Sequence, residues 1–73
     1  MKKKDLLWEL GNKVRQIRIE KSLTQTELAN NIGKDQPSIN RLEKGRINPS
    51  YIYLLEICEG LEISIQELLE NKL

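Results

Sequence analysis

The chain has 73 residues, of which 38% are hydrophobic and 32% charged, with a formal net charge of +1, one cysteine and no histidine. This length allows one domain over residues 1–73, and domains this small bury only about 60% of the surface that the unfolded chain exposes. Cys58 has no partner for a disulfide within the chain, which fits a reducing, cytoplasmic environment. The apolar runs are too short for a membrane span or a signal sequence.

Charge is divided unevenly along the chain. Residues 1–48 carry eleven Lys or Arg and six Asp or Glu, a net +5, whereas residues 49–73 carry one Lys and five Glu, a net −4. This division allows one end of the domain to face an anion while the other end stays away from it. The basic start, Met1-Lys2-Lys3-Lys4, is followed by no apolar stretch of signal-peptide length and is predicted to be a solvated tail.

The first predicted helix begins at Leu6 and ends near residues 21–22. Its apolar positions recur every three or four residues, at Leu7, Leu10, Val14 and Ile17. This spacing forms one apolar stripe along a helix, so the segment is predicted to be amphipathic and to pack on the core. Trp8 falls outside that stripe, and we expect it to pack at the edge of the domain.

A second, shorter helix is predicted to begin after Thr24, which is a candidate N-cap. Glu27 stands three residues later and completes a capping box, and Gly33 ends the helix. The residues of this helix that would face the core are Leu28, Ala29 and Ile32.

The third predicted helix has two candidate N-caps, Asp35 and Gln36. Pro37 is tolerated in a first helical turn, but it disfavours helical geometry in the residue before it, so Gln36 is the alternative cap. The inward residues of this helix are Ile39 and Leu42, and Gly45 closes it.

Two more helices complete the chain. Asn48-Pro49-Ser50 starts the fourth, whose inner face would hold Tyr51, Leu54, Cys58 and Leu61. The last short helix would hold Ile65, Leu68 and Leu69. No stretch alternates with a period of two for long enough to form a sheet. The sequence therefore predicts an all-α, compact five-helix domain.

The second and third helices have the spacing of a helix-turn-helix motif over residues 24–45. Ala29 follows Gln25 by four residues, and Gly33 follows Ala29 by four and precedes Ile39 by six. A small side chain such as that of Ala29 lets two helix backbones approach closely. Glycine takes the left-handed conformation of a tight turn with little strain, which explains Gly33.

Four fragments in this order carry a resemblance to a known family: LTQTELA (23–29), IG (32–33), INRLEKG (39–45) and NPS (48–50). With them the chain resembles the XRE family, the small helix-turn-helix regulators that include Cro and the lambdoid phage repressors. The resemblance covers most of the chain, from Val14 to Leu69, because the stretch LLEICEGLEISIQELL looks like the family's closing helices. It implies a lambda repressor-like DNA-binding fold.

The resemblance also implies roles in DNA binding. The third helix would lie in the major groove, where glutamine and asparagine pair with adenine and arginine pairs with guanine. The implied base readers are Gln36, Pro37, Asn40 and Arg41. The implied phosphate contacts are Gln25, Lys44, Arg46 and Asn48. An ion pair between Arg18 and Glu43 would hold the first helix against the third.

The function expected from this pattern is sequence-specific DNA-binding transcriptional regulation, by repression at an inverted-repeat operator. Three roles share the pattern: phage-style repressor, controller of a restriction–modification operon, and antitoxin of a toxin pair. The alternative is a protein-interaction module such as an antitoxin, and the protein partners considered are a toxin and RNA polymerase. Without histidine or a visible nucleophile–base pair, no enzymatic activity, cofactor or metal site is expected.

A homodimer is predicted through the helices of residues 49–73. If Leu54 and Leu61 fill the core, the same segment keeps more apolar residues than so small a monomer should expose. These residues are Ile52, Tyr53, Leu55, Ile63 and Ile65. Twofold pairing would bury them and would place two reading helices about one helical turn, ~34 Å, apart along DNA.

Overall fold

The computed structural model describes residues 2–70, which form five helices and no strand. The helices are α1 (Lys3–Glu20), α2 (Gln25–Asn31), α3 (Gln36–Glu43), α4 (Tyr51–Leu61) and α5 (Ile65–Glu70). The prediction of an all-α domain with five helices is confirmed. Residue 1 and residues 71–73 lie outside the described part, as do the ends of the predicted domain (1–73) and of the predicted dimerising segment (49–73).

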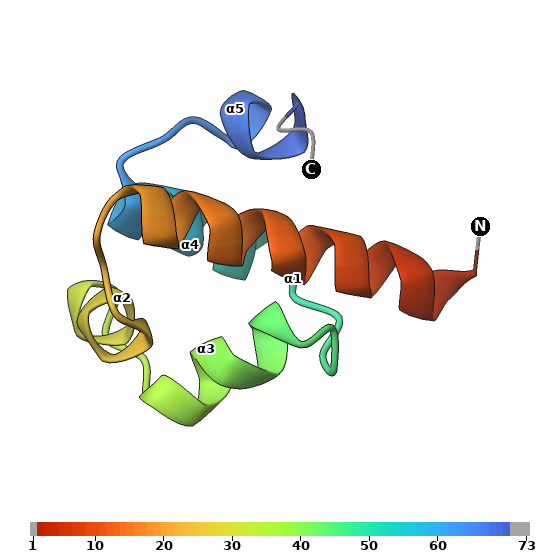
Figure 1. Cartoon of the computed structure of the whole chain (residues 1–73), viewed down its shortest axis with the longest axis horizontal. Coiled ribbons are helices and arrows are strands. Elements are labelled where there is room, and N and C mark those ends of the chain that lie inside the picture. The colour runs from red at the N-terminus through yellow and green to blue at the C-terminus, as the bar shows by residue number, and fades with distance from the viewer. Residues whose placement is uncertain (1, 71–73) are drawn as a thin grey trace.

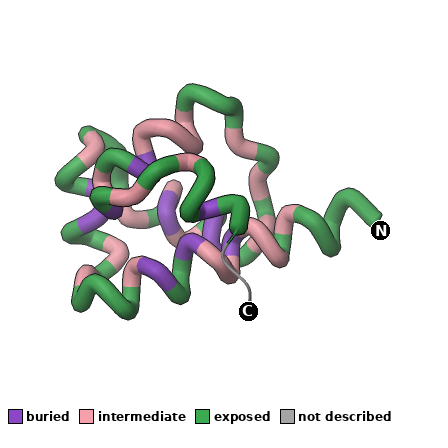
Figure 2. Tube along the Cα trace, turned by 90° about the horizontal axis from the view of Figure 1, so that it is seen from above, coloured by how far each residue is buried: buried purple, intermediate pink, exposed green. Residues whose placement is uncertain are grey.

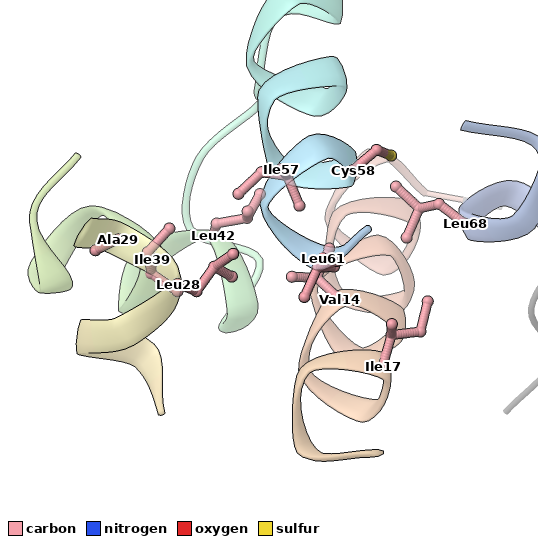
Figure 3. Close-up of a cluster of buried hydrophobic side chains, with 10 residues drawn as sticks. All are labelled: Val14, Ile17, Leu28, Ala29, Ile39, Leu42, Ile57, Cys58, Leu61 and Leu68. Carbon is pink, nitrogen blue, oxygen red and sulfur yellow. The ribbon is translucent and has the colours of Figure 1, made fainter. Parts of the chain in front are cut away.

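The longest helix, α1, runs across the domain and separates α5 from the motif helices. Figure 1 shows α2 and α3 on one side of α1, α5 on the other, and α4 behind it. All five helices send side chains into one core (Figure 3). The buried core residues are Val14, Ile17, Leu28, Ala29, Ile39, Leu42, Ile57, Cys58, Leu61 and Leu68. Within residues 2–70, no helix is long and apolar enough to span a membrane.

Local hydrogen bonds set the starts of the two motif helices. The Thr24 side chain accepts from the Glu27 backbone N–H, and the Glu27 carboxylate accepts from the Thr24 N–H, which completes a capping box. Asp35 Oδ1 accepts from the Ser38 N–H at 2.9 Å and caps α3. Gln36 is the first residue of α3, so the alternative in which Gln36 is the cap is wrong.

Helix α1 begins at Lys3, earlier than the predicted start at Leu6, so Lys3 and Lys4 are helical rather than part of a tail, while residue 1 of that predicted tail lies outside the described part. The apolar stripe gave no signal for these first residues, because they face solvent. Gly11 is buried in the middle of α1, and a Cβ atom there would lie 2.3 Å from the carbonyl oxygen of Leu42. Only glycine allows α1 to cross the end of α3 at this distance.

The predicted inner faces of α4 and α5 were partly wrong. Tyr51 and Leu69 were expected to face the core but are 65% and 57% exposed, whereas Ile57 is fully buried. Tyr51 is the first residue of α4, and side chains tilt toward the N-terminus of their helix, so its ring lies beyond the core. Leu69 lies about 100° round the helix from Leu68, which is the buried residue of the six-residue helix α5, so Leu69 does not face the core.

The surplus apolar surface predicted for α4 and α5 is also smaller than expected. Of the five residues proposed for it, only Ile52 is largely exposed, at 64%. Tyr53, Ile63 and Ile65 are partly buried and pack against the core.

Candidate nucleic-acid interface

Helix α3 has one face buried in the core and one polar face that is exposed. Ile39, Leu42 and Glu43 are buried, whereas Pro37 and Arg41 are exposed and Lys44 follows them as the exposed C-cap. Gln36, Ser38 and Asn40 lie at the borders between the two faces and are half-buried. A helix anchored along one side in this way can place its polar side into a groove of another molecule.

Arg18 and Glu43 join α1 to the end of α3. Arg18 Nε donates to Glu43 Oε2 at 2.6 Å and Nη2 donates to Oε1 at 2.9 Å, which makes a bidentate pair. The third contact runs from Arg18 Nη1 to the carbonyl oxygen of Leu23 at 2.7 Å, just before α2. Side-chain exposure is only 11% for Arg18 and 2% for Glu43. One guanidinium therefore fixes α1, the start of α2 and the end of α3 relative to each other.

Gln25, the first residue of α2, connects this ion pair to the polar face of α3. Its Nε2 donates to Glu43 Oε1 at 3.0 Å. Its Oε1 accepts from Gln36 Nε2 at 2.7 Å and from Asn40 Nδ2 at 3.3 Å. The amide orientation is fixed, because a flipped amide would set its nitrogen against two donors and its oxygen against a carboxylate.

The network leaves specific groups free on the polar face. The Gln25 carbonyl oxygen uses both lone pairs, but its Nε2 keeps one N–H. Gln36 and Asn40 each keep one amide N–H and a carbonyl oxygen beyond the bonds that hold them. Arg41 makes one side-chain bond, from Nη2 to Ser38 Oγ at 3.2 Å, and is otherwise exposed.

The charges around α3 favour binding of an anion near its C-terminal end more than near its N-terminal end. Lys44, Arg46 and Asn48 are exposed in the segment that follows the helix. Asp35 stands at the opposite end, where its hydrogen bonds with Ser38 hold the pKa of the carboxyl below its ordinary value. Its negative charge is directed at the N-terminus of α3, where a carboxylate is stabilising.

The structure places the ten candidate residues in two groups. Arg18, Glu43, Gln25, Gln36 and Asn40 form the continuous hydrogen-bonded network. The others are not part of it: Pro37, Arg41, Lys44, Arg46 and Asn48. Sequence reasoning missed Gly11, although a glycine inside an amphipathic helix is a signal of close packing.

Comparison with known proteins identifies the class. The family model described as Helix-turn-helix matches residues 14–68. The chain therefore belongs to this family of XRE-type helix-turn-helix proteins, and the resemblance seen in its motifs is confirmed.

Individual relatives match over most of the chain. An uncharacterised HTH-type transcriptional regulator of Sinorhizobium fredii, y4dJ, is 39% identical over 59 residues, which cover 81% of this chain and 77% of the relative. Control protein C.MunI of a Mycoplasma species is 34% identical over 68 residues, 92% of each chain. The restriction–modification controller protein C.Esp1396I, solved as a tetramer with its natural 35-base-pair operator, has a TM-score of 0.84 and 32% identity, covering 89% of this chain and 86% of that one. The chain is a DNA-binding transcriptional regulator.

Proposed function

We propose that this regulator represses transcription by binding an inverted-repeat operator as a homodimer, with α3 of each protomer in the major groove. One observation carries the proposal: α3 is anchored by buried Ile39 and Leu42, while Arg41 and the free amide groups of Gln36 and Asn40 remain available on its other side. A helix held by packing and presenting amide and guanidinium groups fits the major groove, whose base edges form a distinctive pattern of donors and acceptors.

The base-reading roles follow from the groups that stay free. Gln36 donates one N–H to Gln25, which leaves its carbonyl oxygen and second N–H to pair with an adenine. Asn40 is held in the same way. Arg41, tethered only to Ser38, would pair bidentately with a guanine. Pro37 has no donor and would make apolar contact with the groove, for example with a thymine methyl group.

The phosphate-binding roles belong to groups at the two ends of the motif. The remaining N–H of Gln25 would donate to a phosphate oxygen at the start of α2. Lys44, Arg46 and Asn48 would contact the backbone beyond the other end of α3. Such contacts position the protein on the duplex and provide affinity without distinguishing base sequences.

Dimerisation would use the exposed apolar residues of α4 and α5. Tyr51 and Ile52 in the first turn of α4 and Leu69 in α5 each expose more than half of their surface, and Leu55 is half-buried nearby on α4. Burying these side chains against a second copy removes apolar area from water and stabilises a small core. The resulting twofold symmetry would match an inverted repeat.

Of the three candidate biological roles, control of a restriction–modification operon has the most support. C.MunI and C.Esp1396I, both named as control proteins, match almost the whole chain. The proposed regulator would act in the cytoplasm, where its DNA lies, and would have no enzymatic activity, in keeping with a family of DNA-binding regulators.

The experiment compares Arg41→Ala and Lys44→Ala with the wild type on the operator, recovered from the upstream region of the gene, and on scrambled DNA across a salt series. Arg41→Ala should lose about 1–3 kcal/mol of operator affinity and relax preference at one base pair per half-site. Lys44→Ala should weaken binding to both DNAs alike and flatten the salt dependence by about one unit per protomer.

Two outcomes would contradict the proposal. If Arg41→Ala leaves the ratio of operator affinity to scrambled-DNA affinity unchanged, Arg41 does not read a base. A wild type without sequence preference at any salt concentration would overturn the regulator proposal and favour a protein as the main partner.

A further inference from the structure

The N-terminal end of α1 extends beyond the body of the domain. Figure 2 shows this end of the chain leaving the packed region with mostly exposed residues. Leu6 and Trp8 are 50% and 57% exposed here, and Trp8 is the single tryptophan of the chain. The segment precedes residues 14–68, which the family model matches, so the helix-turn-helix motif does not account for it.

Two close backbone contacts define which face of this segment points toward α3. A Cβ atom on Gly11 would lie 2.3 Å from the carbonyl oxygen of Leu42, and one on Gly45 would lie 2.8 Å from the Cα atom of Trp8. Helix α1 therefore crosses both the end of α3 and the turn that follows it. Lys4 lies four residues before Trp8 and seven before Gly11, on the same face of α1 and one turn beyond the crossing.

We use the term flanking face for the surface of Lys4, Trp8, Lys44 and Arg46. Trp8 lies between Lys4 and Gly45, and Gly45 separates Lys44 from Arg46 in the chain. All three cationic side chains are exposed, and within residues 2–70 no carboxylate pairs with any of them. The flanking face therefore combines three unpaired positive charges with one exposed aromatic ring.

We propose that the flanking face binds phosphates of double-stranded DNA just outside the base pairs that α3 reads. This inference rests on the proposed function, because Lys44 and Arg46 belong both to the flanking face and to the proposed phosphate contacts. The face continues from that turn onto α1 along Trp8 and Lys4, and the acidic residues Asp5 and Glu9 follow them at about 100° round the helix. DNA that reaches from Lys44 to Lys4 covers the indole of Trp8.

The test uses two synthetic duplexes of the operator recovered in the experiment above. One ends at the outermost base pair of each half-site, and the other carries about one further helical turn of DNA on each side. Wild-type protein should bind the longer duplex more tightly and with a steeper salt dependence, by about 0.9 in the logarithmic slope for each added phosphate contact. The fluorescence of Trp8 should change with the longer duplex and change less with the shorter one.

Lys4→Gln should reduce the slope on the longer duplex by about 0.9 per protomer and leave binding to the shorter duplex unchanged. Lys3→Gln is the matched control, because it removes the same charge from the same turn but about 100° round the helix. Its binding to the longer duplex should stay close to that of the wild type.

Each outcome decides the inference. Equal affinity and slope of the wild type on both duplexes would overturn the flanking face while leaving the proposed function intact, because operator preference is measured on the shorter duplex. Equal losses of affinity for the longer duplex in Lys4→Gln and Lys3→Gln would also overturn it. Such losses would indicate a long-range effect of positive charge rather than a contact between Lys4 and a phosphate. Absence of sequence preference on either duplex would overturn the proposed function and this inference together.

Discussion

Replacement of Glu43 by alanine tests the ion pair that joins α1 to α3. The Glu43 side chain is 2% exposed and accepts two hydrogen bonds from Arg18 and one from Gln25. Alanine leaves the guanidinium with the Leu23 carbonyl oxygen as its remaining partner in the network. Removing one partner of a buried pair destabilises by about 3–5 kcal/mol. Because a domain of this size has a total stability of about 4–11 kcal/mol, the variant should lose a large fraction of its stability.

The measurement is urea unfolding followed by circular dichroism at one fixed protein concentration, because dimerisation makes apparent stability concentration-dependent. The pair between Lys34 and Glu56 is the control: its atoms are 3.7 Å apart and its side chains are 38% and 40% exposed. Glu56→Ala should lose less than about 1 kcal/mol. If Glu43→Ala is too unstable to measure, replacing Arg18 with methionine and Glu43 with leucine together should restore much of the stability. A loss in Glu43→Ala no larger than in the control would refute the reasoning.

Three further perturbations test other parts of the structure. Gly11→Ala should lower the free energy of unfolding by about 2 kcal/mol or more, because the Leu42 carbonyl is backbone and has little freedom to move; an unchanged or higher urea midpoint would contradict this. Ile52→Lys should shift sedimentation toward the monomer and weaken operator binding, whereas Ile19→Lys, 47% exposed on α1, should do neither. Asp35→Asn should make the melting temperature fall less steeply as the pH is lowered. The folded state lowers the pKa of Asp35, so its ionised form stabilises the fold above the unfolded pKa. This contribution is lost as the pH falls through the folded pKa. Asparagine can still cap α3, so melting temperatures of the two proteins that fall in parallel from about pH 5 to about pH 2 would argue against a contribution from the charge of Asp35.

The caps and the turn could be predicted because they depend on neighbouring residues. Thr24 and Asp35 each accept from a backbone N–H three residues away, and Gly33 takes a φ of +68° in the turn. The inner face of α4 depends on the rest of the fold. Tyr51 and Ile57 both belong to plausible apolar stripes along that helix, and only packing against the other helices decides that Ile57 is buried.

The candidate site could be predicted only in part, for the same reason. Arg18 and Glu43 are 25 residues apart, and family resemblance rather than local pattern suggested that they meet. Nothing local relates Gln25 to Asn40, 15 residues away, so their hydrogen bond emerges only when α2 and α3 are packed together. The exposed polar face of α3 was easier to predict, because the apolar spacing of Ile39 and Leu42 already determines the opposite side.

Gln25 links the ion pair that stabilises the domain to the residues of α3 proposed to read bases. Its carbonyl oxygen holds the amides of Gln36 and Asn40 before any DNA arrives. Immobilising one such side chain on binding costs about 0.5–1.5 kcal/mol, so holding two in advance favours binding by about 1–3 kcal/mol. The same arrangement limits which bases the helix can come to read. Exchanging Gln36 for a residue without a donor removes one of the two hydrogen bonds that Gln25 Oε1 accepts, so a change of base preference at Gln36 should also disturb the phosphate contact proposed for Gln25. Arg41 is outside this network, and its exchange should alter base preference with little effect on the rest of the domain.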